Sequence, residues 1–216
     1  MKTKFTQTLL AIGLASGIMA GMLIHNTGAI NTLLVQLNIL QVKQQASYAA
    51  LPYEELINTA DVIFVGKLIE ISPTKWNQDS GEYWGEEAIQ YYTLRFEVSE
   101  FVEDKIGANN QKTIEITVLG PSLLDGNTDY NLQIGDEVLV FAGQTNLAWC
   151  DSGTKSVITL KTDPSLSFFI QNPNGNYEGQ TVRLLGKGQF TVDKMSLPLP
   201  NFIAQIRGLL NKPPSP

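Results

Sequence analysis

The sequence predicts a mainly β protein whose strands close into a small barrel, and three observations support this prediction. Short runs of apolar and β-branched residues alternate with polar residues at a period of two, which is typical of strands with one buried face. Gly, Asn, Asp and Pro separate these runs, and these residues favour turns. The chain has 216 residues, of which 43% are hydrophobic and 17% charged, so it is large enough for one good core.

Five strands are predicted in the middle of the chain. The segment 91–101 alternates most clearly, with Leu94 and Phe96 on one face and Arg95 on the other. Closing five strands into a barrel removes the exposed edges of an open sheet. The predicted strands span residues 61–71, 91–101, 113–119, 137–142 and 156–161.

Further elements flank these strands. A short helix is predicted over Pro52–Thr59, because acidic residues follow its start and favour the positive end of the helix dipole. After the fifth strand, a hairpin region is expected to contain strands 168–171, 182–185 and 189–192. The last element is an amphipathic helix, Asn201–Asn211, with Asn201 as its cap. The expected organisation is an N-terminal segment, residues 1–50, a barrel, residues 51–161, and a C-terminal hairpin and helix, residues 162–216, packed on the barrel.

The N-terminal segment has the composition of an export signal. It begins with MKTK, and an apolar run of 16 residues follows over Leu9–Ile24. That length is short of the ~20 residues that a membrane-spanning helix needs. The sequence therefore favours a cleaved signal, with small-residue sites at 27–29 and 47–49, over a retained membrane anchor. A second apolar stretch covers 30–42.

The charge distribution excludes one class of partner. Residues 1–50 contain three lysines and no acidic residue, so residues 51–216 carry 12 basic and 21 acidic residues, a net charge of −9. A surface of that sign repels the phosphate backbone. Nucleic acid is therefore not an expected partner.

Few residues are suited to catalysis. His25 is the only histidine and lies in the export segment, which excludes Cys–His pairs, Ser-His-Asp arrangements and histidine metal sites. Cys150 is the only cysteine, and it has three possible interpretations: a catalytic thiol, half of a lost disulfide, or a small buried residue. The third interpretation is favoured, because no general base accompanies the thiol. The acid pairs 86–87 and 136–137 leave a carboxylate hydrolase as an enzyme hypothesis, although adjacent residues on a strand point to opposite faces.

One segment has a spacing similar to that of a calcium loop. Asp125, Asn127 and Asp129 match positions 1, 3 and 5 of such a loop. Tyr130 stands where the loop needs glycine, and Asp136 stands where it needs glutamate. An Asn- and Asp-rich turn explains the same residues, so no metal and no cofactor is predicted.

The connection between the first two strands, Ser72–Ile89, is too long for a tight hairpin and contains Trp76, Tyr83 and Trp84. Tryptophan and tyrosine in a loop are typical anchors for a protein partner. The alternative is a loop that folds back and covers the mouth of the barrel with its own rings. The three aromatic residues are the candidate partner-binding residues.

Five stretches of the sequence resemble the tissue inhibitor of metalloproteinases-like (TIMP-like) domain over Leu51–Lys161. They are VIFVGKLIEI after Ala60-Asp61, YYTLRFEVSEFVEDKIG with TIEITVLG, LQIGDEVLVFA, and LAWCDSGTKSV. The resemblance implies a five-stranded OB-fold Greek-key barrel of the netrin-module type, which also occurs in bacterial exported proteins. Family members are not enzymes, and in the inhibitors the loop that corresponds to Ser72–Ile89 flanks the protease-binding edge.

The resemblance also bears on the cysteine. In the inhibitors, the cysteine after the fourth strand forms a disulfide with an N-terminal Cys-x-Cys, whose first cysteine binds the protease zinc. Cys150 matches the strand-side position, but SYAALPYEEL contains no cysteine. The resemblance therefore implies an unpaired Cys150 that packs as a small apolar side chain, and a missing zinc-binding group.

Together these observations predict an exported, bacterial binding module that catalyses nothing and contacts a protein or a cell-envelope component through the loop Ser72–Ile89. Three alternatives remain at this point. They are a protease-inhibitor-like protein that uses this loop alone, a carboxylate hydrolase with two carboxyls facing one cleft, and a purely structural envelope protein held by a retained anchor.

Overall fold

The computed structural model describes residues 51–125, 131–186 and 189–211. In this part of the chain, nine strands form one sheet, and three α-helices and a short 3-10 helix accompany it. The prediction of a mainly β protein is confirmed. The strands are β1 (Val62–Ile71), β2 (Lys75–Trp76), β3 (Gln90–Asp104), β4 (Thr113–Leu119), β5 (Glu137–Trp149), β6 (Gly153–Leu160), β7 (Phe168–Gln171), β8 (Asn176–Gly186) and β9 (Gln189–Pro198). The helices are α3 (Tyr53–Thr59), α4 (Pro164–Ser167), α5 (Leu199–Leu210) and the 3-10 helix η1 (Leu123–Asp125).

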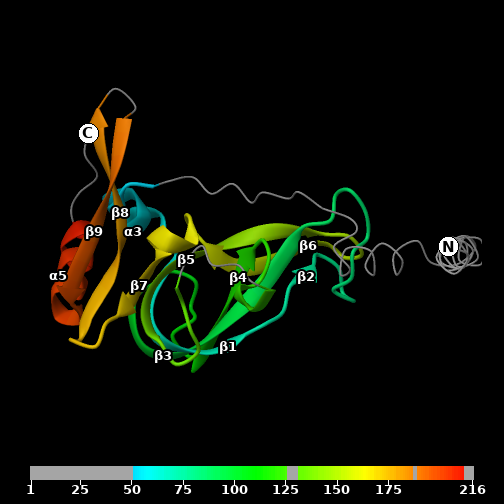
Figure 1. Ribbon diagram of the computed structural model, residues 1–216, viewed down its shortest axis with the longest axis horizontal. Coiled ribbons are helices and arrows are strands. Elements are labelled where there is room, and N and C mark those ends of the chain that lie inside the picture. The colour runs from blue at the N-terminus through cyan, green and yellow to red at the C-terminus, as the bar shows by residue number, and fades with distance from the viewer. Residues whose placement is uncertain (1–50, 126–130, 187–188, 212–216) are drawn as a thin grey trace, which may run out of the picture.

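Five of the strands are paired in a closed ring (Figure 1). The pairing order is β1-β3-β4-β6-β5, and β5 pairs in turn with β1. The pairing of β4 with β6, through Thr117 and Thr159, is parallel, and the other four pairings are antiparallel. Beyond the ring, the sheet continues from β5 through β7 and β8 to β9, which is its terminal strand.

The strand β1 is bent by irregularities in its pairing with β3. Its register with β3 shifts at three places, and such bulges bend a strand and increase its twist. Gly66 lies at one of these shifts, where a Cβ atom would stand 2.9 Å from the carbonyl oxygen of Glu97. Only glycine permits this close approach without a backbone movement.

The interior of the ring is the first of the two main apolar cores of the described residues. Alternate residues of the ring strands point into it, as the period-two patterns predict. Phe64 and Phe96 meet there edge to face with ring centroids 5.6 Å apart. The buried members of this core are Val62, Phe64, Leu68, Tyr92, Leu94, Phe96, Ala108, Ile114, Ile116, Val118, Leu132, Val138, Val140, Ala142, Leu160 and Phe168.

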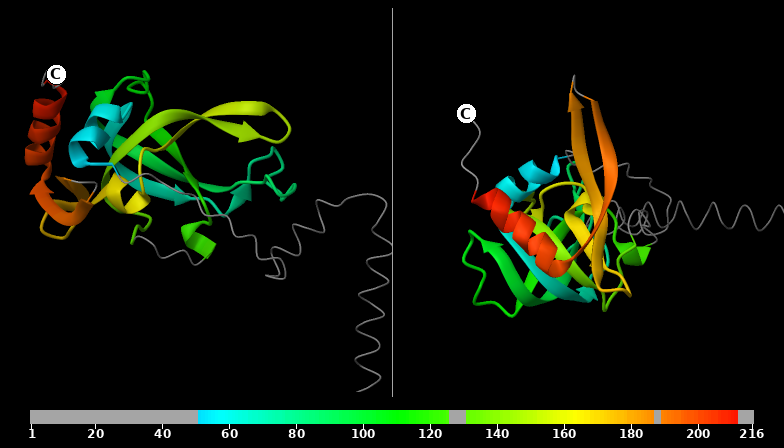
Figure 2. Two further views of the ribbon diagram at one scale, coloured as in Figure 1. Left: turned by 90° about the horizontal axis from the view of Figure 1, so that it is seen from above. Right: turned by 90° about the vertical axis from the view of Figure 1, so that its left-hand side faces the viewer.

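The second core lies outside the ring, where α3 and α5 cover β1 and β5 (Figure 2). Ile63 and Val65 of β1 face this second core, which explains why the first half of β1 is apolar without alternation. The α5 residues Phe202 and Ile206 are completely buried in it. The C-terminal helix therefore closes a core that the ring alone would leave exposed.

Two details of the C-terminal region differ from the prediction. The helix α5 begins at Leu199, two residues early, with Pro198 at the N-cap and Pro200 in the first turn, so the prediction that Asn201 caps it is wrong. Proline is favoured in the first turn because its missing N–H has no partner to lose there. The strands β8 and β9 are also longer than the four residues predicted for each.

Some predictions concern residues outside the described part of the chain. The export segment Leu9–Ile24 lies there, as do Asn127 and Asp129 of the calcium-like spacing. Within residues 51–125, 131–186 and 189–211, the helices are too short and too polar for any of them to span a bilayer.

Candidate functional site

The loop Ser72–Ile89 and the turn Cys150–Ser152 lie side by side at one end of the ring, away from α3 and α5 (Figures 1 and 2). The loop connects β1 to β3, and the turn connects β5 to β6. The two segments are far apart in the sequence, and the closed pairing of the strands brings them together. We call these two segments, with the adjoining ends of β3, β5 and β6, the aromatic end.

The aromatic rings of the loop face inward. Trp76 is 5% and Tyr83 7% exposed, and their rings meet edge to face with centroids 5.0 Å apart. Ala88 completes this small cluster, and the half-buried Trp84 packs against it. The three predicted anchors therefore pack against one another and Ala88. The rings of Trp76 and Tyr83 are buried within the loop, which agrees better with the alternative of a loop that folds back on its own rings.

Asn77 is the residue that fixes the loop to the turn. Its side chain is 1% exposed, and its Oδ1 accepts hydrogen bonds from the Trp84 Nε1–H (2.8 Å) and the Ile89 N–H (2.6 Å). Its Nδ2 donates to the Ala148 carbonyl (2.9 Å), and its own carbonyl accepts from the Cys150 N–H (3.0 Å). Burying this amide costs little free energy, because its hydrogen bonds are satisfied. The same bonds hold three segments of the chain in one arrangement. Sequence reasoning missed Asn77, because no motif marks it.

A second aromatic contact lies on the strand side of this loop. The rings of Trp149 and Tyr91 are 5.2 Å apart between centroids, and the Lys155 ammonium lies 4.5 Å from the Trp149 ring centroid. Burial raises the pKa of the Tyr91 phenol, and the nearby charges of Glu115 and Asp79 raise it further. The phenol therefore stays neutral at ordinary pH. Trp149 and Lys155 were also not predicted, although Trp149 precedes the only cysteine.

Charged contacts hold the outer side of the loop. Asp79 forms an ion pair with Lys155, and the Asp79 N–H donates to the Asp151 carboxylate (2.9 Å). These groups are exposed, so each contact stabilises by no more than about 1 kcal/mol. The remaining exposed carboxylates of the loop, those of Glu82, Glu86 and Glu87, face solvent and make its outer surface acidic.

Cys150 is exposed, so the expectation that it packs as a small apolar side chain is wrong. The physical reason is the length of β5, which continues past the predicted end at Ala142 to Trp149. This places Cys150 in the turn beyond the strand rather than on a face against the core. It is a free cysteine.

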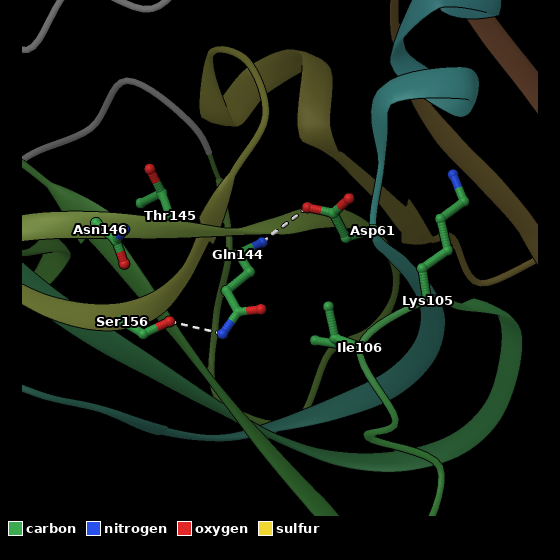
Figure 3. Close-up of a pocket in the computed structure, with 7 residues that line it drawn as sticks. All are labelled: Asp61, Lys105, Ile106, Gln144, Thr145, Asn146 and Ser156. Atoms are coloured by element: carbon green, nitrogen blue, oxygen red, sulfur yellow. Dashed lines mark hydrogen bonds between the residues drawn. The ribbon is translucent and has the colours of Figure 1, made fainter.

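A shallow pocket of about 540 Å³ lies beside the ring at the junction of β1, β5 and β6 (Figure 3). The Asp61 carboxylate accepts from the Gln144 N–H (2.9 Å) and pairs with the Lys161 ammonium (3.1 Å). Asp61 is the one carboxylate among the described residues of the lining, whereas a carboxylate hydrolase needs two that face each other. The described lining residues are Asp61, Lys105, Ile106, Gln144, Thr145, Asn146 and Ser156.

Asp125 and the acid pair 136–137, which the sequence also singled out, have structural contacts. The Asp136 carboxylate accepts from the Gln133 N–H (2.8 Å) within a turn, and the Glu137 carboxylate accepts from the Tyr177 hydroxyl (2.6 Å). Asp125 accepts from the N–H (3.1 Å) and the hydroxyl of Thr74. Across the described residues, no group of three or more His, Cys, Asp or Glu side chains has a geometry that could hold a metal ion.

Comparison of the chain with protein-family models, curated proteins and solved structures finds no match. The geometry of the aromatic end and the order of strand pairing are properties of the chain itself, and both point to the same surface.

Proposed function

We propose that this protein is an exported, non-catalytic binding module with an OB-fold of the TIMP-like type. The pairing order supports the fold assignment, because the ring strands follow each other as first, second, third, fifth and fourth, with one parallel pair between the third and the fifth. OB-folds bind their ligands through the face of strands 2 and 3 and through the loops that join strands 1–2 and 4–5. In this chain those loops are Ser72–Ile89 and the turn Cys150–Ser152, the two segments of the aromatic end.

The observation that carries the proposal is the attachment of these two loops to each other through Asn77. A binding loop that is already ordered loses less conformational entropy when a partner docks. The cluster around Trp76 and Tyr83 has the same effect, since it fixes the loop from within. On this proposal the rings are the support of the binding surface, and the exposed residues of the loop make the contact.

The exposed residues define the chemistry of the partner. Glu82, Glu86 and Glu87 are exposed on the loop, and residues 51–216 have a net charge of −9. Complementary charge steers association and favours partners of opposite sign. The proposed partner is therefore a protein or cell-envelope component with a basic surface. Export through the N-terminal segment would place the module outside the cytoplasmic membrane, and the composition of residues 1–24 supports this part of the proposal.

The proposal is tested by affinity capture from the exported-protein fraction with two matched charge reversals of the full chain. Glu86→Lys/Glu87→Lys changes an exposed acidic pair on the loop, and Glu54→Lys/Glu55→Lys changes an exposed acidic pair on α3 at the other end of the molecule. A partner that is lost by the loop variant and retained by the helix variant supports the proposal. A partner that both variants retain would place the contact elsewhere, and one that both lose would reflect net charge alone.

A further inference from the structure

The strand β5 is paired on both edges in its first half and on one edge in its second half. Residues 137–142 pair with β1, and residues 138–140 also pair with β7. From Gly143 to Trp149, β5 pairs with β6 alone, because the chain that precedes β1 forms the helix α3 and not a strand. One edge of β5 is therefore without a strand partner over this stretch in the described part of the chain.

Hydrogen bonds show which backbone groups face that free edge. In a strand, the N–H and C=O of one residue point to the same side, and those of the next residue point to the opposite side. The Ala142 carbonyl accepts from the Asp61 N–H (3.0 Å), and the Gln144 N–H donates to the Asp61 carboxylate (2.9 Å). Even-numbered residues of β5 therefore face the side of β1, away from β6. Ala148 follows the same rule, since its carbonyl accepts from the Asn77 side chain (2.9 Å).

Four backbone groups on this edge have no hydrogen-bond partner among the described residues. They are the Gln144 carbonyl, the N–H and the carbonyl of Asn146, and the Ala148 N–H. Asp61 bounds this row of groups at one end, and Asn77 bounds it at the other. Gln144, Asn146 and Ala148 are all exposed, so the row is accessible from outside.

The shallow pocket at the junction of β1, β5 and β6 lies along this row (Figure 3). Gln144, Thr145 and Asn146 line one side of it, and Lys105 and Ile106, the residues that follow β3, line another. Its volume of about 540 Å³ lies within the range of ordinary ligand sites. An extended chain therefore has space beside β5.

We propose that this edge of β5 binds an extended peptide segment of another protein and adds it to the sheet as a strand. The free groups alternate along the edge as acceptor, donor, acceptor and donor, and an extended backbone supplies the complementary series at the same spacing. An antiparallel peptide exchanges both backbone hydrogen bonds of one of its residues with Asn146. Peptides that complete a sheet edge in this way owe their affinity to main-chain hydrogen bonds.

The dimensions and the charge of the site favour a single peptide over the edge of a second copy. The row is short, and Asp61 and Asn77 close both of its ends, whereas pairing between two folded sheets uses long, open edges. The net charge of residues 51–216 is −9, so a neutral or basic segment is favoured. This edge is separate from the exposed carboxylates of the loop Ser72–Ile89, so binding at either surface can fail without the other.

The test attaches a probe peptide of threonine and lysine to the exposed Cys150 thiol of the full chain through a short Gly/Ser linker. Cys150 directly follows β5, so the tether raises the concentration of the peptide at the edge to about the millimolar range. The matched control peptide has the same sequence and charge, but its peptide nitrogens are methylated and cannot donate hydrogen bonds. Amide hydrogen exchange at Asn146 and Ala148 is measured by NMR for the protein alone and for both conjugates.

The expected result is that both amides exchange rapidly in the protein alone and at least about tenfold more slowly with the unmethylated peptide attached. With the methylated peptide, the rates should stay those of the protein alone. Unchanged rates with both peptides would overturn the proposal, as would equal slowing by both, because main-chain pairing would then not be the cause. Slow exchange in the protein alone would also overturn it. The edge would then be paired with a second copy if the protection increases with protein concentration, and within the chain if it does not.

Discussion

Large apolar residues are buried at the aromatic end and exposed on the outer part of the β8–β9 hairpin, where Leu185, Phe190 and Val192 lie. We call these three residues the hairpin tip. At the aromatic end, Trp76 and Tyr83 are buried, and Asn77 satisfies the backbone around them. At the tip, Phe190 remains 57% exposed. The difference shows that local composition does not decide whether an aromatic residue is buried or exposed. Contacts with strands distant in the sequence decide it.

The largest expected effect comes from the second core, which the C-terminal helix α5 covers. Phe202→Ala is expected to lower the free energy of unfolding by about 3–5 kcal/mol, because Phe202 is completely buried in the second core. Deleting residues 198–216 should destabilise the protein further. Thermal and urea unfolding measure both effects, with Gln205→Ala on the exposed face of α5 as the control. An unchanged melting temperature after the deletion would show that the ring is stable without this helix.

The next largest loss of stability is expected at the aromatic end, where Asn77 has no counterpart at the hairpin tip. Asn77→Ala removes the partners of the Trp84 indole N–H, the Ile89 N–H and the Ala148 carbonyl. Each unsatisfied buried group costs about 1–3 kcal/mol, so we expect a loss in that range or above it by urea unfolding. Asn110→Ala, at an exposed position, is the matched control. Equal stability of the two variants would mean that Asn77 does not hold the loop.

A smaller effect depends on pH. Burial raises the pKa of the Tyr177 phenol, and its hydrogen bond to the negatively charged Glu137 raises it further. Below pH ~10, the ordinary value for tyrosine, the phenol is neutral in both states and its contribution to stability is complete. As the pH rises above ~10, the unfolded state loses the proton first, so the folded state loses stability. Urea midpoints measured from neutral to alkaline pH should fall less steeply for Tyr177→Phe than for the unchanged protein, and parallel curves would contradict this account.

The smallest effect is expected at the tip itself. Phe190→Ser should change the free energy of unfolding by no more than about 0.5 kcal/mol, because the ring has few contacts to lose. The same substitution at Trp76 should cost several times more, since that ring is 5% exposed. Thermal unfolding of the two variants side by side measures the contrast directly. Similar losses would mean that the tip is covered in the folded protein.

The sequence predicted the strands well where one face of each is buried. All five predicted ring strands are present, because alternation along β3 and β4 records the inside and outside of the ring. The second half of β5 was missed, since Gln144, Thr145 and Asn146 are all exposed and show no alternation. That part of β5 is stabilised by its pairing with β6, a partner that a local pattern cannot record.

The loop of the candidate site could be predicted from the sequence, and the orientation of its aromatic rings could not. The loop Ser72–Ile89 could be recognised from its length and its aromatic residues. The inward orientation of Trp76 could not be predicted, because it depends on Asn77 and on contacts with the β5–β6 turn. The exposure of Cys150 was missed for a related reason, since it follows from the unpredicted length of β5.

The most direct test of the account is native-state hydrogen exchange at the two amides that Asn77 holds, those of Ile89 and Cys150. If the loop and the turn form one fixed surface, both amides should exchange only when a large part of the ring opens, at rates close to those of the buried pairs in β3. Exchange at these two amides as fast as in an unstructured peptide would contradict the account, because the aromatic end would then be two independent loops rather than one fixed surface.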